Sequence, residues 1–164
     1  KKINFSRLII PVSSILVALF DFLMALILFI GILVFYQQPV SWTVIFYWPL
    51  AMLFSVIATL GLGSWLAALN VKYRDFRYVI PFLIPALFFL TPVIYPISLL
   101  KYPLLPYALA TSPMYIAVEF FRLPLTNTLP NMDFVWISLA SNIIFLLVGV
   151  IYFRKTEDFF ADFA

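Results

Sequence analysis

The sequence contains no cysteine and no histidine. Without cysteine, the chain has no disulfide, no thiolate metal ligand and no thiol nucleophile. Without histidine, it lacks the side chain that most often serves as a general base and as a zinc ligand. We therefore predict no catalytic residue, no metal site and no cofactor in this chain.

Charged residues are also scarce. Only 10% of the residues are charged, whereas 65% are hydrophobic and 20% are aromatic. A soluble domain has about 25% charged residues and about 45–50% apolar ones. A water-soluble fold of 164 residues could not bury so much apolar side chain, so lipid must be part of its solvent. The basic residues flank apolar runs and form no stripe, so we predict no nucleic-acid partner.

Four long apolar runs follow one another along the chain, at about 12–36, 44–69, 79–95 and 134–153. A helix of about 20 residues crosses the roughly 30 Å of membrane hydrocarbon. The sequence therefore predicts an all-α integral membrane protein with four transmembrane helices in one transmembrane domain over 1–164. In the second run, Gly63 and Ala67 are four residues apart, and we expect their shared face to admit a close helix neighbour. The third run contains three prolines, so we expect its helix to be kinked and packed against protein.

The segment 96–133 is apolar but contains six prolines. Its longest proline-free piece, 114–123, would extend only about 15 Å as a helix, which is half of a bilayer. We predict a pair of short re-entrant helices on the external side. Irregular backbone at such depth must be covered by protein or line a cavity.

Basic residues fall into three clusters that predict the orientation. They are Lys1, Lys2 and Arg7; Lys72, Arg74 and Arg77; and Arg154 and Lys155. Four spans place all three clusters on one side, which the positive-inside rule assigns to the cytoplasm. A fifth span at 104–121 would move the last cluster outside, so parity favours the re-entrant interpretation. Only Lys101 and Arg122 then remain on the far side.

Several segments resemble one family of membrane proteins. Residues 61–78 read GLGSWLAALNVKYRDFRY, residues 88–96 read FFLTPVIYP, and residues 119–122 read EFFR. These segments resemble type-2 ABC transporter permeases that export polysaccharides such as O-antigen, capsule or teichoic acid. The resemblance extends over essentially the whole chain. Family members have six spans, so the four spans predicted here correspond to spans three to six, and the chain looks like a fragment. The chain departs from the family at Ser112-Pro113, where asparagine usually precedes the proline.

The resemblance implies a set of partners. A separate nucleotide-binding subunit would hold ATP and Mg²⁺, because this chain has no G-x-x-x-x-G-K-[ST] loop. The permease would pair with a second protomer, contact membrane lipid and pass a lipid-linked glycan out of the cytoplasm. Its location would be the bacterial plasma (inner) membrane, with both ends of this chain cytoplasmic. The following residues would couple the permease to the ATPase: Asn70, Lys72, Tyr73, Arg74, Asp75 and Arg77.

Other candidate sites have a functional and an ordinary interpretation. The 72–77 cluster is either that coupling element or a solvated loop. Glu119 and Arg122, three residues apart on one helix face, form either an external gate or a simple ion pair at the rim. Asp21 is either an intramembrane polar residue with a partner, or a shallow residue paired with a basic side chain. Five aromatic residues either line a glycan path or pack and anchor the helices: Phe88, Phe89, Tyr95, Tyr107 and Tyr115.

Two rival functions remain. A permease of the same type could export drugs or lipids. An integral membrane glycosyl or acyl transferase would instead need convergent acidic, histidine or metal-binding groups. The seven acidic residues are scattered along the chain, which favours a permease over an enzyme.

Overall fold

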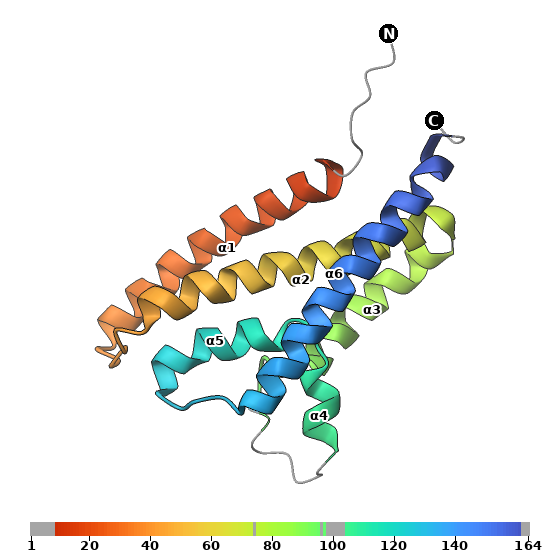
Figure 1. Cartoon of the computed structure of the whole chain (residues 1–164). Coiled ribbons are helices and arrows are strands. Elements are labelled where there is room, and N and C mark those ends of the chain that lie inside the picture. Colours follow the sequence, from red (N-terminus) through yellow and green to blue (C-terminus); the bar gives the residue numbers. More distant parts are fainter. Residues whose placement is uncertain (1–8, 74, 96, 98–103, 162–164) are drawn as a thin grey trace.

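The computed structural model describes residues 9–73, 75–95, 97 and 104–161. Over these residues the chain forms six α-helices and no strand (Figure 1). They are α1 Ile9–Phe35, α2 Val44–Lys72, α3 Phe76–Leu90, α4 Leu105–Ala110, α5 Tyr115–Thr126 and α6 Met132–Ala161. The predicted all-α class is confirmed.

Three of the helices, α1, α2 and α6, are long and apolar enough to cross a membrane. The predicted count of four spans is not confirmed, because α3 has only 15 residues, or about 22 Å of length. This helix ends where Thr91 turns to extended backbone, with φ −83° and ψ 126°. Thr91 precedes Pro92, and proline disfavours the helical conformation in the residue before it. The run 79–95 is therefore not one continuous helix.

The expected packing of α3 against protein is wrong for the described part of the chain. None of the α3 residues is buried there, although the helix contains Pro81 and Pro85. Its large apolar side chains, such as Phe82 and Phe89, are exposed. The helix leaves the end of α2 and stays largely separate from the other helices along its length.

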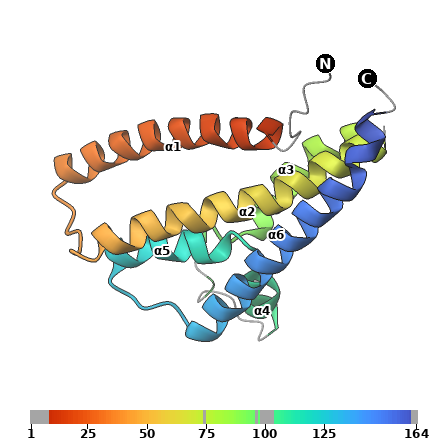
Figure 2. The same ribbon diagram turned by 45° about the horizontal axis from the view of Figure 1, so that its top comes forward.

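Helices α2 and α6 cross at the centre of the molecule, and both ribbon views show this (Figures 1 and 2). The residues that α2 buries are all small: Ala51, Ala58, Gly61, Ser64 and Ala68. A Cβ atom at Gly61 would lie 2.7 Å from the backbone nitrogen of Leu146, and one at Gly149 would overlap the Gly61 carbonyl. The two backbones are therefore in direct contact, which only glycine permits.

The predicted small-residue face of α2 is wrong at Gly63. A Cβ atom added there would meet no atom within 4 Å. Residues two apart on a helix point about 200° apart, so Gly61 faces α6 while Gly63 is turned away from it. The partner of the contact, Gly149, has no small neighbour at helical spacing that would have marked it.

Helix α5 lies along α2 and is joined to it by aromatic side chains. The Trp48 indole N–H donates to the Phe121 carbonyl at 3.3 Å. The rings of Tyr47 and Phe120 meet edge-on at 5.4 Å. The backbone N–H of Ser41 donates to the Pro124 carbonyl at 3.0 Å, so the end of α5 lies beside the α1–α2 loop.

The turn between α4 and α5 is held by polar side chains of α6. Ser138 Oγ donates to the Ser112 carbonyl at 2.8 Å and accepts the Ile116 N–H at 3.1 Å. Asn142 Nδ2 donates to the Pro113 carbonyl at 3.1 Å and to the Phe54 carbonyl at 3.3 Å. The bonds to Ser112, Pro113 and Ile116 satisfy backbone groups that the break between α4 and α5 leaves without helical partners.

The described ends of the three long helices sort into two groups. The start of α1, the α2–α3 turn and the end of α6 lie toward one end of the molecule in both views (Figures 1 and 2). Lys72 Nζ lies 5.7 Å from the centroid of the Tyr152 ring, which places the ends of α2 and α6 together. The α1–α2 loop and the start of α6 lie at the other end.

We predict that Gly149→Ala lowers the free energy of unfolding by about 1–3 kcal/mol, because the added methyl group forces two backbones apart. Gly61→Ala should do the same. The matched control is Gly63→Ala, which adds a methyl group into open space. Thermal unfolding in detergent would measure the three variants, and an equal loss in Gly63→Ala would contradict the proposed crossing.

We also predict that Asn142→Leu destabilises the protein by about 1–2 kcal/mol, because the Pro113 carbonyl loses its donor. The exposed change Ile144→Leu on the same helix serves as the control. Protease cleavage at the α4–α5 turn should rise in Asn142→Leu alone. Unchanged unfolding and cleavage would show that the turn does not depend on this amide.

Candidate functional site

The α2–α3 turn collects most of the residues predicted to couple the permease to an ATPase. Helix α2 ends at Lys72, and α3 begins at Phe76 after Asp75. Asn70, Asp75, Arg77 and Tyr78 line a hollow of about 360 Å³ at this turn. The predicted residue Arg74 lies outside the described residues.

Two residues near this turn have distinct environments. The side-chain oxygen of Asn70 is buried and accepts no hydrogen bond in the described part of the chain. Lys72, in contrast, places its ammonium group 5.5 Å from the Tyr73 ring centroid and 5.7 Å from that of Tyr152. Such cation–π contacts hold the side chain against α6. Lys72 therefore joins two helices, while Asp75 and Arg77 stay exposed at the turn.

Asp21 lies near the middle of α1 rather than near its end. It is about 18 Å along the helix from Ile9 and about 21 Å from Phe35. Its side chain is exposed on the described surface.

Glu119 and Arg122 form an ion pair that reaches beyond their own helix. Arg122 Nη1 lies 3.5 Å from Glu119 Oε1, with side-chain exposures of 25% and 17%. Arg122 Nη2–H also donates to the Val93 carbonyl, in the segment that follows α3. The hydroxyls of Thr91 and Ser112 meet at 2.9 Å. Two side-chain contacts thus tie the end of α3 to the α4–α5 region.

The five predicted path aromatics fall into two groups. Tyr107 meets the Phe134 ring at 5.1 Å and Tyr115 meets it at 6.5 Å, and Tyr95 packs against the same cluster. Phe88 and Phe89 are exposed on α3, and their rings lie 6.0 Å apart. A hydrogen bond of 3.0 Å from the Tyr95 hydroxyl to the Phe89 carbonyl joins the groups. Phe88 lies in the wall of one cavity, and Tyr115 lies in the wall of another.

One polar cavity contains residues from two of the predicted sites, the external gate and the glycan path. It has a volume of about 550 Å³ and contains Glu119, Arg122 and Tyr115 from α5, with Phe134 from α6. The loop between the two helices adds Thr128 and Asn131. The loop residues were not singled out from the sequence, because polar loop residues carry no periodicity that shows which way they face.

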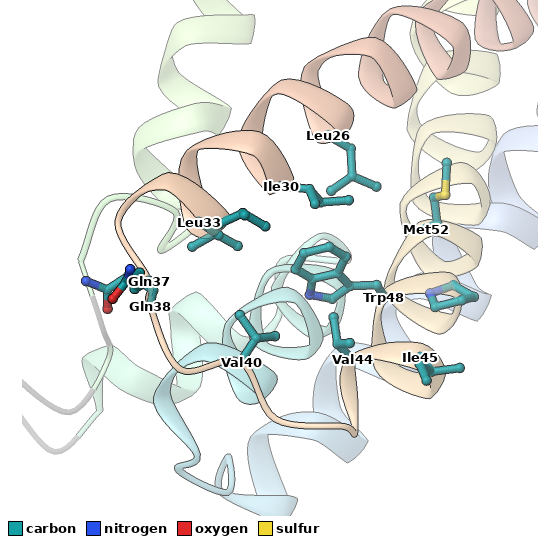
Figure 3. Close-up of a pocket in the computed structure, with 12 residues that line it drawn as sticks. Leu26, Ile30, Leu33, Gln37, Gln38, Val40, Val44, Ile45, Trp48 and Met52 are labelled. Carbon is teal, nitrogen blue, oxygen red and sulfur yellow. The ribbon is translucent and has the colours of Figure 1, made fainter.

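Two larger cavities are lined mostly by hydrocarbon. One, of about 720 Å³, lies between α1 and α2. There Leu26, Ile30 and Leu33 face Trp48, and Gln37 and Gln38 lie at the end (Figure 3). The other, of about 700 Å³, lies between α2, α3 and α6, and Gly63 and Phe88 form part of its wall. Neither brings together groups capable of acid–base chemistry.

Sequence reasoning also missed the polar residues of α6 that hold the α4–α5 turn. Ser138, Ser141 and Asn142 follow the spacing i, i+3, i+4 inside an apolar run. This spacing places them on one helix face and could have been recognised. The carbonyls that these side chains bind could not have been identified from the sequence, because they are 25 or more positions away in the chain.

The comparisons with known proteins agree with this architecture. The O-antigen export system permease protein RfbA of Myxococcus xanthus is 27% identical over 163 residues, which cover 98% of this chain and 62% of that protein. A Klebsiella pneumoniae protein of the same name is 24% identical over 162 residues, which cover 99% of this chain and 62% of that protein. The chain thus spans about 62% of the length of these curated relatives, and no solved structure matches it.

A family model described as ABC-2 type transporter matches residues 2–125. The match covers most of the chain and includes α1, α2, α3 and the α4–α5 turn. Together with the three apolar helices of membrane-spanning length, it shows that the chain belongs to the ABC-2 type transporter family.

Proposed function

We propose that this chain is part of the membrane-spanning subunit of an ABC exporter that moves a lipid-linked polysaccharide out of the cytoplasm. The glycan would be of the O-antigen, capsule or teichoic-acid type. The main support is the family match along most of the chain, together with relatives named as O-antigen export permeases. A separate ATPase subunit would bind ATP and Mg²⁺, and a second permease protomer would complete the membrane path.

The depth of the α4–α5 turn supports a re-entrant arrangement. Ser138 and Asn142 lie about 9 and 15 Å along α6 from Met132. Phe54, which also binds Asn142, lies about 15 Å along α2 from Val44. If both helices span the membrane, the turn lies about one third to one half of the way through it. Helix α5 then returns toward the α1–α2 loop on the external side.

This arrangement gives α3 a defined path. It starts at the α2–α3 turn on the cytoplasmic side and ends at Thr91, beside Ser112 of the α4–α5 turn. The fourth crossing would therefore consist of α3 followed by non-helical backbone. In this topology the protein lies in the bacterial inner membrane, and both described chain ends face the cytoplasm.

The same path suggests how ATP hydrolysis acts on the external side. The α2–α3 turn would dock on the ATPase, and α3 would transmit its motion because it packs little against other helices. At the far end, Thr91 and Val93 are tied to Ser112 and Arg122. Movement of α3 would therefore pull on α5, and the Glu119–Arg122 pair would act as part of an external gate.

We predict that single cysteines at positions 74 and 158 are protected from an impermeant maleimide in intact cells, while one at position 101 is labelled. Residues 1–164 contain no cysteine, so none of them reacts with the maleimide before a cysteine is introduced. Permeabilised cells provide the control, since all three positions should then react. Labelling of 74 or 158 in intact cells, or protection of 101, would overturn the topology.

We also predict that the double reversal Asp75→Arg with Arg77→Glu reduces glycan export by at least about tenfold. Removing a buried charge contact at an interface commonly costs 2–5 kcal/mol. The matched control is Arg154→Glu, which reverses an exposed charge toward the end of α6, at the same end of the molecule as the α2–α3 turn. Export and copurification of the ATPase would be measured beside membrane insertion. Normal export by the double variant would exclude a coupling role for this turn.

A further inference from the structure

The polar cavity between α5, the α5–α6 loop and the start of α6 has an unusual combination of walls. Phe134 is partly buried whereas Tyr115 is only 2% exposed, so Phe134 supplies the accessible aromatic surface on one side. Glu119, Arg122 and Asn131 contribute a carboxylate, a guanidinium and an amide. Thr128 adds a hydroxyl, which bonds to that of Thr126 at 2.8 Å. The other two large cavities are lined mainly by hydrocarbon.

The charges in this cavity balance each other. The Arg122 guanidinium lies 3.5 Å from the Glu119 carboxylate, so a ligand meets no uncompensated positive charge. A guanidinium has five N–H donors, and its contacts with Glu119 and Val93 do not exhaust them. The carboxylate likewise has several acceptor positions. Such a site favours a neutral ligand with many hydroxyl groups over an anion.

The Phe134 ring favours the same class of ligand. A sugar ring has an apolar C–H face and a rim of hydroxyl groups, so it can pack on an aromatic ring while its rim forms hydrogen bonds. Charge-assisted hydrogen bonds to a carboxylate or guanidinium are about twice as strong as neutral ones. A volume of about 550 Å³ lies within the range of small-molecule sites.

We propose that this cavity is a saccharide-binding site that holds a sugar unit of the exported glycan on the external side of the membrane. The proposal rests on the proposed function, because that function supplies the glycan. A sugar in the cavity contacts Arg122, which also binds Val93 after α3. Occupancy of the site is therefore linked to the contact that ties α3 to α5.

The test uses the full-length permease in lipid nanodiscs and saturation-transfer NMR. The probes are mannose, galactose, glucose, rhamnose and N-acetylglucosamine, with inorganic phosphate as the anionic alternative. Leu129→Trp fills the cavity from its exposed rim, and Met132→Trp adds the same bulk at an exposed position outside it. We expect transfer to at least one sugar, reduced by about tenfold or more in Leu129→Trp and retained in Met132→Trp.

Three results would overturn the site: no transfer to any of the five sugars, equal transfer in Leu129→Trp, or binding of phosphate alone. Glycan export by the wild-type protein is measured in parallel. Export without sugar binding in the cavity would refute this site and leave the proposed function intact. Sugar binding without glycan export by any assay would instead count against the proposed function.

Discussion

An apolar solvent leaves a backbone polar group no partner except other parts of the protein, and this requirement organises much of the structure. The chain breaks its helices at Thr91 and between α4 and α5. Each break frees carbonyl and N–H groups, and α6 supplies Ser138, Ser141 and Asn142 to bind several of them. Without these side chains, the α4–α5 turn would leave those peptide groups unpaired, which costs several kcal/mol each in an apolar environment.

The contact between α2 and α6 makes this arrangement possible. In a membrane there is little hydrophobic force between helices, so close backbone contact and dispersion become important. Gly61 and Gly149 let the two helices touch, and this brings Asn142 within reach of Phe54 on α2. The α2–α6 pair therefore acts as a scaffold on which α5 and the α4–α5 turn are held. Helix α3 is left largely outside this scaffold, and none of its residues is buried in the described part of the chain.

The two ends of the molecule differ in how their charges are placed. At the α2–α3 turn, Asp75 and Arg77 are exposed, and the buried side-chain oxygen of Asn70 accepts no hydrogen bond from the described residues. At the other end, Glu119 and Arg122 neutralise each other beside aromatic rings. The charges are thus exposed at the α2–α3 turn and paired with each other at the other end.

The sequence by itself determined the membrane setting, the helical class and the three long spans, because apolar composition and run length are local properties. It also indicated short helices between 96 and 133, since proline punctuates that segment. It did not show that α3 ends at Leu90 instead of completing a span. Pro92 disfavours a helical Thr91, but the helix contains two other prolines without ending at them.

Only the tertiary structure decided which small residues touch and which polar groups pair. Gly61 rather than Gly63 contacts α6, because rotation about the helix axis depends on the partner helix. Arg122 was expected to bind Glu119, but its second contact with Val93 comes from a segment 29 residues away. Contacts between distant segments depend on how the helices pack, and a single sequence carries no local pattern for them.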